Sequence, residues 1–335
     1  MRGARSRGYH EARGGGGVSV AAVVLAAGEG KRLKTDKAKV LHEAGGRALV
    51  DHVLDALAPL VPRPLVIVVG HLRDQVERHL AGREALFAVQ DPPRGTGDAV
   101  GRALALLPRE GEVLVLSGDV PLIGAATLAA LVDLRRDRGA AAAMATAHLP
   151  EPGGYGRVVR GADGDVTTVV EANDASPEQR EIREVNAGTY VFDLAALRPA
   201  IAGLSPANAQ QEYYLTDVVG ILAARGMRVV GLPLADPAEM AGVNSRADLA
   251  EVHRLLGARV IAALQAAGVT ALDPATTWVD ASCAVGRDTV LEPGVHLRGA
   301  CRIGAGCRIG AHAVLEDVTL AAGATVAPLT YRRGD

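Results

Sequence analysis

The chain has 335 residues, of which 49% are hydrophobic and 22% charged, so it can bury a large core and has room for two domains. A formal net charge of −2 excludes the basic composition of a nucleic-acid or anionic-membrane binder, and no apolar run is long enough to span a bilayer. The cysteines, Cys283, Cys301 and Cys307, form no CxxC pair and have no histidine at zinc-finger spacing, which favours a reduced, cytoplasmic protein.

Residues 1–17 carry arginines and a glycine run without any hydrophobic period, so we expect a disordered tail. The next segment, "VSVAAVVLAAG", imitates a signal peptide because arginines precede it. It also opens a repeating pattern of apolar run, loop and helical period that continues to Gly139, and this favours a buried strand. Strands that are apolar throughout are buried on both faces, so the pattern predicts a mainly parallel sheet with helical crossovers.

The pattern loosens between residues 139 and 244 into short strands, polar loops and one helical stretch, "QEYYLTDVVGILAARG". We expect this segment to form a lid over the edge of the sheet. The helical period of residues 247–268 then predicts a long connecting helix.

The C-terminal region follows a different period, in which apolar residues recur at every sixth position. These residues are Val279, Val285, Leu291, Leu297, Ile303, Ile309 and Leu315, with Leu320 and Val326 after a one-residue slip. A six-residue repeat predicts a β-helix of about three coils. Cys301 and Cys307 occupy equivalent positions on successive faces of such a helix, so we expect them to serve packing.

Basic residues crowd the loop "LAAGEGKRLKTDKAKVLHEAGG", directly after the first apolar run. Gly28 and Gly30 begin a G-x-G pattern, but Leu33 stands where the dinucleotide fingerprint has its third glycine, and no Walker sequence is near. A strand-end loop with free N–H groups and several cations suits a substrate with several phosphates, although a solvated basic surface is the alternative. The cations are Lys31, Arg32, Lys34, Lys37 and Lys39.

Two further strand ends carry polar side chains that suit a nucleotide. Asp119 in "LSGDVPL" is placed to hold Mg²⁺ against phosphate oxygens, or alternatively to cap the next helix. Gln90 ends the strand before "DPPRGTGDAV", and its amide can both donate to and accept from a nucleobase edge. Gly95 and Thr96 are expected at the start of the following helix.

Seven motifs in this order resemble the uridylyltransferase half of the bacterial bifunctional N-acetylglucosamine-1-phosphate uridylyltransferase and glucosamine-1-phosphate acetyltransferase family. The resemblance covers roughly residues 18–249. The motifs are the basic loop above, "QDPPRGTGDAV", "LSGDVPLI", "GGYGRVVR", "VVEANDASPEQREIREVNAGTYVFD", "NAQQEYYLTDVV" and "AGVNSRADL".

The resemblance implies an α/β, Rossmann-like (glycosyltransferase-A-like) nucleotidyltransferase domain with a mainly parallel sheet, followed by a short left-handed parallel β-helix. We expect the nucleotidyltransferase domain at residues 18–246, a connecting helix and linker at 247–276, the β-helix at 277–328 and a tail at 329–335.

The resemblance also implies a Mg²⁺-dependent reaction of UTP with N-acetylglucosamine 1-phosphate, in which the sugar phosphate attacks the α-phosphorus in line and expels pyrophosphate. Arg32 and Lys39 would stabilise charge, and Asp119 and Asn244 would hold Mg²⁺. Gly156, Glu171 and Asn186 would hold the sugar. The nucleotide would contact Leu25, Ala26, Ala27, Gly28, Lys39, Gln90, Gly95 and Thr96.

Four positions depart from the pattern of the family. Lys31 stands where threonine is usual, Ala38 replaces a proline, Asp98 sits where "GTGHA" is common, and Ala187 replaces the threonine of "NTG". The missing proline would loosen the loop that carries Lys39, and Ala187 leaves open which sugar is bound.

The family's acetyltransferase residues lie in later coils than this sequence contains, so we expect no acetyltransferase activity. The short β-helix would cap the chain or form a homotrimer contact. Another sugar 1-phosphate or dTTP as substrate is the alternative within enzymes. A non-catalytic scaffold is the alternative outside them, and the cations and metal ligands named above argue against it.

Overall fold

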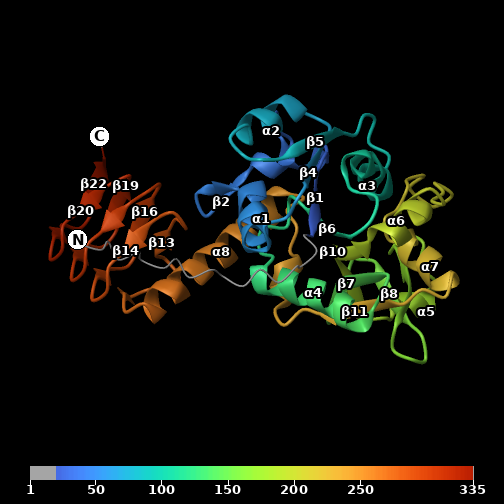
Figure 1. Ribbon diagram of the computed structural model, residues 1–335. Helices are drawn as coiled ribbons and strands as arrows, with labels where there is room; N and C mark the ends of the chain where they lie inside the picture. The colour runs from blue at the N-terminus through green and yellow to red at the C-terminus, as the bar shows by residue number, and fades with distance from the viewer. Residues whose placement is uncertain (1–19, 335) are drawn as a thin grey trace, which may run out of the picture.

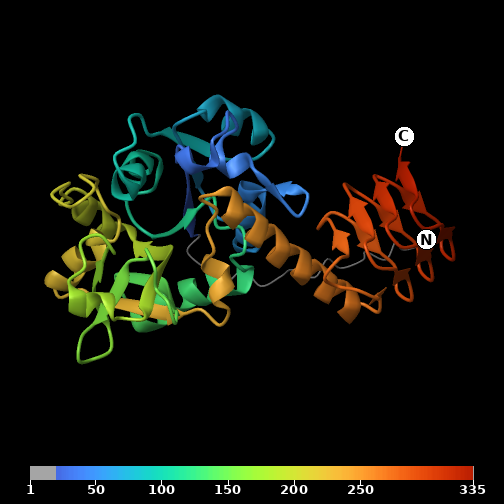
Figure 2. The same ribbon diagram turned by 180° about the vertical axis from the view of Figure 1, so that it is seen from behind.

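The computed structural model describes residues 20–334, and the expected tail at residues 1–17 lies outside them. The described chain forms two lobes (Figure 1): an α/β lobe and a β-helix joined to it by α8 (Arg246–Ala266). Figure 2 shows α8 running from the α/β lobe to the first strands of the β-helix. The single tryptophan, Trp278, lies where α8 meets the β-helix, with its ring against His253.

A nine-stranded sheet organises the α/β lobe, in the order β11-β7-β10-β6-β1-β4-β5, with β8 paired to β10 and β9 to β8. Strands β6, β1, β4 and β5 are parallel, as the sequence predicts, whereas β10 is antiparallel to β6, β7 and β8. The bounds are β1 Ala21–Ala26, β4 Leu65–Val69, β5 Leu86–Val89, β6 Glu112–Ser117, β7 Ala142–His148, β8 Arg157–Arg160, β9 Val166–Val170, β10 Glu184–Asp193 and β11 Val229–Pro233.

Helices cover both faces of this sheet. The core on one face includes residues of α1, α2 and α4, and the core on the other includes residues of α3, α6 and α7. Successive residues of β1 alternate between the two, since Val23 belongs to one core and Val24 to the other. The bounds are α1 Leu49–Leu57, α2 Arg73–His79, α3 Thr96–Ala103, α4 Ala125–Arg138, α5 Pro177–Arg180, α6 Leu194–Ile201 and α7 Asp217–Ala224.

Short elements complete the α/β lobe. The loop after β1 contains two 3₁₀ helices and a hairpin, and this hairpin packs against α8. The bounds are η1 Lys31–Leu33, η2 Lys39–Leu41, β2 Glu43–Ala44, β3 Arg47–Ala48, η3 Ala58–Leu60, η4 Leu104–Leu106 and η5 Pro237–Met240.

The segment at residues 139–244 is not the lid that the sequence suggested. Strands β7 and β10 from this segment lie inside the sheet, and β11 forms its edge. The β7 sequence AAMATAH has small side chains that give a weak strand signal, yet six of its seven residues are buried. The pairing of β10 with β6 on one side and β7 on the other therefore makes this segment part of the sheet.

The second lobe is a parallel β-helix, as the six-residue repeat predicts. Its strands stack in three columns, β12-β15-β18-β21, β13-β16-β19-β22 and β14-β17-β20. The repeated apolar residues line its interior, and Cys301 and Cys307 are buried free thiols among them. The bounds are β12 Thr270–Ala271, β13 Trp278–Val279, β14 Ala284–Val285, β15 Val290–Leu291, β16 His296–Arg298, β17 Arg302–Ile303, β18 Arg308–Ile309, β19 Val314–Glu316, β20 Thr319–Leu320, β21 Thr325–Val326 and β22 Tyr331–Arg333.

The β-helix is longer than residues 277–328, the range expected from the sequence. It begins with β12, where Ala271 pairs with Leu291. The number of residues between these two positions is not a multiple of six. The β-helix ends with β22, where Arg332 pairs with Leu315, so part of the expected tail is a paired strand. Neither strand presents an apolar residue in the six-residue register, and the repeat therefore did not reveal them.

Close stacking of the coils predicts that Gly304→Ala destabilises the β-helix. A Cβ at Gly304 would lie 2.4 Å from the backbone nitrogen of Ala322 in the next coil, which is too close without a shift of the backbone. We expect a loss of about 1–3 kcal/mol in the free energy of unfolding, as for other overpacked sites. Urea unfolding followed by the fluorescence of Trp278 measures this lobe. Gly154→Ala, with open space around its Cβ, is the control; equal midpoints for both variants would contradict the prediction.

Candidate active site

A cavity of about 400 Å³ lies at the carboxyl ends of β1, β5 and β6 and brings together the three loops singled out in the sequence. In a parallel sheet these ends meet at one edge, which is where such folds bind ligands. Its lining residues are Leu25, Ala27, Gly28, Glu29, Lys31, Lys39, Val40, Gln90, Pro93, Gly95, Thr96, Ala99, Ser117, Asp119 and Glu212. Ala26 is absent from this lining because it faces the core on the α1 side of the sheet.

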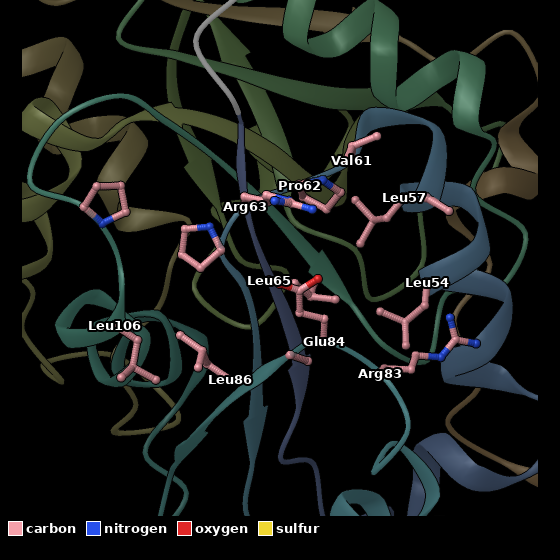
Figure 3. Close-up of a pocket in the computed structure, with 14 residues that line it drawn as sticks. Leu54, Leu57, Val61, Pro62, Arg63, Leu65, Arg83, Glu84, Leu86 and Leu106 are labelled. Carbon is pink, nitrogen blue, oxygen red and sulfur yellow. The ribbon is translucent and has the colours of Figure 1, made fainter.

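A larger hollow, of about 1060 Å³, lies at the opposite end of the strands (Figure 3). Leu54 and Leu57 lie on one side of it and Leu86 and Leu106 on the other. Its lining is mostly apolar, and although it includes Arg63 and Arg83, it lacks the glycine loop, the lysines and the Asp119 that the sequence indicates for a phosphate substrate. The smaller cavity is therefore the candidate active site.

Lys39 joins the two residues expected to hold a metal. Its ammonium nitrogen, Nζ, forms an ion pair with Asp119 and donates a hydrogen bond of 2.7 Å to Oδ1 of Asn244. All three residues come from segments far apart in the sequence: η2, the loop after β6 and the start of α8. The side chains of Lys39 and Asp119 are only 13% and 17% exposed, so this charge contact is partly shielded from water.

The loop that carries Lys39 is held by a partner that the sequence did not indicate. The backbone N–H of Ala38 donates to Oε1 of Gln75 at 2.9 Å, and Nε2 of Gln75 donates to the carbonyl of Asp36 at 2.7 Å. A proline at position 38 has no N–H to give. The expected loosening from Ala38 is therefore offset by a hydrogen bond from α2, which contains Gln75.

Asn244 is held by the start of α8. Ser245 caps this helix, and Asp248 accepts hydrogen bonds of 2.9 Å from the backbone N–H groups of Asn244 and Ser245. The neighbouring Val243 donates its N–H to the carbonyl of Asp119 at 3.0 Å. These bonds keep the amide of Asn244 beside the carboxylate of Asp119.

The donor set fits a magnesium ion that is shared with a substrate. Mg²⁺ usually takes one or two carboxylates from the protein and completes its shell with water and phosphate oxygens. Asp119 and Asn244 offer one carboxylate and one amide oxygen, and their contact with Lys39 shows that the pair already holds a positive charge. Among residues 20–334, no group of three His, Cys, Asp or Glu side chains forms a protein-only metal site.

Gln90 is buried at the floor of the cavity, with 4% of its surface exposed. Its amide nitrogen, Nε2, donates to the carbonyl of Gly95 and to Oδ2 of Asp98, both at 2.9 Å. Both amide hydrogens are thus in use. This corrects the expectation that Gln90 can donate to and accept from a base at once, because only Oε1 remains free to accept.

Glu212 forms a wall of the cavity that sequence reasoning missed. The N–H of Gly97 donates to the carbonyl of Tyr213 at 2.7 Å, and the N–H of Tyr213 donates to the carbonyl of Arg94 at 2.8 Å. Thr96 accepts from the N–H of Leu215 at 3.1 Å through its hydroxyl. The motif "NAQQEYYLTDVV" carried the signal, but only pairing with the loop before α3 shows that it reaches the cavity.

The residues expected to bind the sugar form a second cluster, outside the lining of the cavity. The N–H of Asn186 donates to the carbonyl of Gly156 at 2.9 Å, and a Cβ at Gly156 would lie 3.4 Å from the carboxylate of Glu171. Because Tyr190 of β10 pairs antiparallel with Val115 of β6, Asn186 lies toward the carboxyl end of β6, where Asp119 also lies. The two clusters thus share one edge of the sheet.

Gly156, Glu171 and Asn186, here called the sugar cluster, lie close enough to Asp119 for its charge to act on the neighbouring Tyr155. Burial and the carboxylates of Asp248 and Asp119 raise the pKa of Tyr155, the residue before Gly156. Burial also raises the pKa of Glu171, and the carboxylates of Asp217 and Asp174 add to this rise. The hydroxyl of Thr216, which donates to Glu171 at 2.8 Å, opposes it.

Arg32 lies apart from these contacts. It is exposed on η1, outside the lining of the cavity, and no residue among 20–334 pairs with its guanidinium. Lys31 does line the cavity, but its ammonium pairs with Glu29 at 2.7 Å and its side chain is 85% exposed. Lys39 is therefore the least exposed cation of the loop.

Residues 22–191 match the MobA-like NTP transferase domain, which is about half of the chain, and residues 282–317 match six bacterial transferase hexapeptide repeats. The chain belongs to the MobA-like NTP transferase family. The expected α/β nucleotidyltransferase fold with a hexapeptide β-helix is thus confirmed.

Curated relatives of this NTP transferase chain are named bifunctional protein GlmU. The chain is 48% identical over 314 residues to that of Mycobacterium tuberculosis, covering 91% of this chain and 63% of the relative. It is 44% identical over 337 residues to that of Mycobacterium ulcerans, covering 93% of this chain and 68% of the relative. The chain thus spans about two thirds of the length of these relatives and belongs to the same family.

A solved structure supports the fold of the NTP transferase domain. A Bacillus anthracis protein assigned as a glucose-1-phosphate thymidylyltransferase matches with a TM-score of 0.57 at 18% identity, covering 70% of this chain and 94% of that chain. None of the helices within residues 20–334 has the length and apolar character that a membrane span requires.

The raised pKa of Glu171 predicts how stability of the NTP transferase lobe depends on pH. The folded state binds the proton of Glu171 more tightly than the unfolded state, so its contribution to the free energy of unfolding falls as pH rises above its ordinary pKa of 4.5. Glu171→Gln keeps an acceptor for Thr216 and removes this loss. We expect the variant to gain stability relative to the parent as pH rises toward neutral, measured by urea unfolding at several pH values.

Glu110→Gln is the matched control for this measurement, because Glu110 is exposed. It should change the pH profile little. A parallel pH profile for Glu171→Gln and the parent would contradict the prediction.

Proposed function

We propose that this chain transfers the uridylyl group of UTP to N-acetylglucosamine 1-phosphate, with Mg²⁺, and releases pyrophosphate. The observation that carries the proposal is the contact of Lys39 with Asp119 and Asn244 beside the cavity at the carboxyl end of a parallel sheet. The family and the named relatives support nucleotidyl transfer, and the sequence resemblance supports this substrate pair.

The chemistry needs positioning and charge neutralisation more than acid–base groups. A phosphate oxygen of the sugar 1-phosphate forms a bond to the α-phosphorus of UTP, and the bond from that phosphorus to pyrophosphate breaks. Asp119 and Asn244 would hold Mg²⁺, which supplies positive charge to the phosphate oxygens when it is bound. Lys39 would stabilise the charge of the triphosphate and of the leaving pyrophosphate. The loop of Gly28 and the exposed Arg32 would add further contacts to the phosphates.

The second cluster would hold the sugar. The carboxylate of Glu171 would accept hydrogen bonds from sugar hydroxyls. Position 156 favours glycine because a Cβ there would lie 3.0 Å from the side chain of Val169 and 3.4 Å from the carboxylate of Glu171. Asn186 precedes a break in the pairing of β10 with β7, and its Oδ1 accepts from the N–H of Gly188 at 2.9 Å. Such bulges commonly redirect side chains beside active sites.

Other sugar 1-phosphates, or dTTP, form the second candidate. Ala187 is buried where the family pattern has a threonine, so no hydroxyl is present beside Asn186. The name of the Bacillus anthracis protein of similar fold also points to a thymidylyl donor for that protein.

Several further expectations stay predictions. These are a cytoplasmic location, a role in supplying cell-wall polysaccharide, a homotrimer contact through the β-helix, and absence of acetyl transfer from acetyl-CoA to glucosamine 1-phosphate. A scaffold without catalysis would have no need for a shielded lysine between a carboxylate and an amide.

A substrate panel tests the proposal. Pyrophosphate release is measured with UTP or dTTP, Mg²⁺ and one of three sugars: N-acetylglucosamine 1-phosphate, glucosamine 1-phosphate or glucose 1-phosphate. We expect release with UTP and the acetylated sugar, and none after EDTA removes the metal. Release only with another sugar or with dTTP would transfer the assignment to that pair. No release with any pair would leave the scaffold as the better account.

Cation variants test the roles within the site. Lys39→Met and Arg32→Ala should each lower kcat by roughly 10²-fold or more, as expected when a partner for developing charge is lost. Lys37→Met is the matched control, because Lys37 lies on the same loop but pairs with the exposed Glu43 at 2.8 Å. Turnover of Lys39→Met close to that of the control would overturn the proposed site, whereas normal turnover of Arg32→Ala alone would remove only Arg32.

A further inference from the structure

We propose that Asp98 is a positioning residue that makes the base pocket selective for uracil over cytosine, by fixing the direction of the Gln90 amide. This inference rests on the proposed function and on the expectation from the sequence that Gln90 contacts the base. Asp98 is one of the four positions where the chain departs from its family's usual residue, and neither the fold nor the reaction described above requires it.

Two acceptors surround the amide nitrogen of Gln90. Nε2 lies 2.9 Å from the carbonyl oxygen of Gly95 and 2.9 Å from Oδ2 of Asp98. Neither the carbonyl nor an ionised carboxylate can donate a hydrogen bond. The group that faces them must therefore be the NH₂ of the amide, and the oxygen Oε1 must point the other way.

A reversed amide would be costly in this place. It would set Oε1 against the two oxygens of Gly95 and Asp98, and Gln90 is too buried for water to relieve the contact. Without Asp98, only the repulsion between Oε1 and the carbonyl oxygen of Gly95 would disfavour the reversed amide. The carboxylate of Asp98 adds a charged acceptor, and hydrogen bonds to charged groups are the stronger ones.

Asp98 is itself held in place. It lies in the first turn of α3, where the helix dipole favours a negative charge, and its other oxygen, Oδ1, lies 3.3 Å from Nε of Arg102 one turn later. The side chain of Asp98 is 15% exposed. The backbone of Gln90 is also fixed, because its N–H donates to the carbonyl of Val69 at 2.8 Å.

The fixed amide presents only an acceptor to the cavity. Among residues 20–334, no group donates to Oε1 of Gln90, so it is available to a ligand. Uracil carries an N–H at ring position N3 and can donate to this oxygen, whereas cytosine carries a lone pair at N3 and would face it with a second acceptor. The pocket thus selects an imide base through a residue that does not touch the base.

The dissociation constants of UTP and CTP, measured by calorimetry with Mg²⁺ for the full chain, test this inference. We expect the parent to bind UTP about 100-fold more tightly than CTP. Asp98→Ala frees one amide hydrogen and should reduce this ratio by about tenfold or more, in line with the loss of one charge-assisted hydrogen bond. Asp98→Asn can still turn a carbonyl oxygen toward Nε2 and should restore most of the ratio.

The outcomes separate this inference from the proposed function. Equal binding of UTP and CTP by the parent would overturn the role of Asp98 without any variant. So would an Asp98→Ala variant that loses affinity for both nucleotides equally, since that is the result of a merely structural role. A reduced ratio in Asp98→Ala, with no pyrophosphate release from the parent and any sugar, would sustain the inference and reject the proposed reaction.

Discussion

A mainly parallel sheet that is buried on both faces is the constraint on which the site depends. Because helices cover both sides, side chains of the strands themselves are committed to the two cores, as Val23 and Val24 show. Most of the polar groups of the site therefore lie in loops beyond the strand ends, and Asn186 of β10 is an exception. The crossovers place the loops after β1, β5 and β6 at one edge, and the cavity forms between them.

In the proposed reaction, Lys39 makes this edge of the sheet a site for phosphates. One ammonium contacts a carboxylate and an amide oxygen from two other segments, so the loop after β1, the end of β6 and the start of α8 are tied together. The oxygens of Asp119 and Asn244 also suit Mg²⁺, whose remaining ligand positions would be open to water and to phosphate oxygens of a substrate. Because the ion pair of Lys39 with Asp119 is partly shielded from water, it is stronger than a surface pair. Asn244, at the start of α8, thus brings the helix that leads to the β-helix into contact with the site.

The antiparallel strand β10 adds the second half of the site. It enters between β6 and β7, and its antiparallel pairing with β6 places Asn186 toward the edge that carries Asp119. Its register with β7 shifts after Asn186. Glu171, directly after β9, and Thr216, directly before α7, complete that cluster. A single sheet edge therefore carries both a cationic half and a half that accepts hydrogen bonds.

The sequence by itself determined the elements whose signal is periodic or chemical. Apolar runs such as the one ending at Ala26 set the parallel strands, the six-residue repeat set the β-helix, and the lysine-rich loop and Asp119 marked one edge. Only the tertiary structure decided the rest: β10 inside the sheet, the hydrogen bond from Gln75 that holds Ala38, the wall at Glu212, and the commitment of the Gln90 amide to Asp98. The physical reason is that periodicity records burial of a residue within its own element, whereas a hydrogen bond between distant segments depends on distances and directions that exist only once the chain has folded.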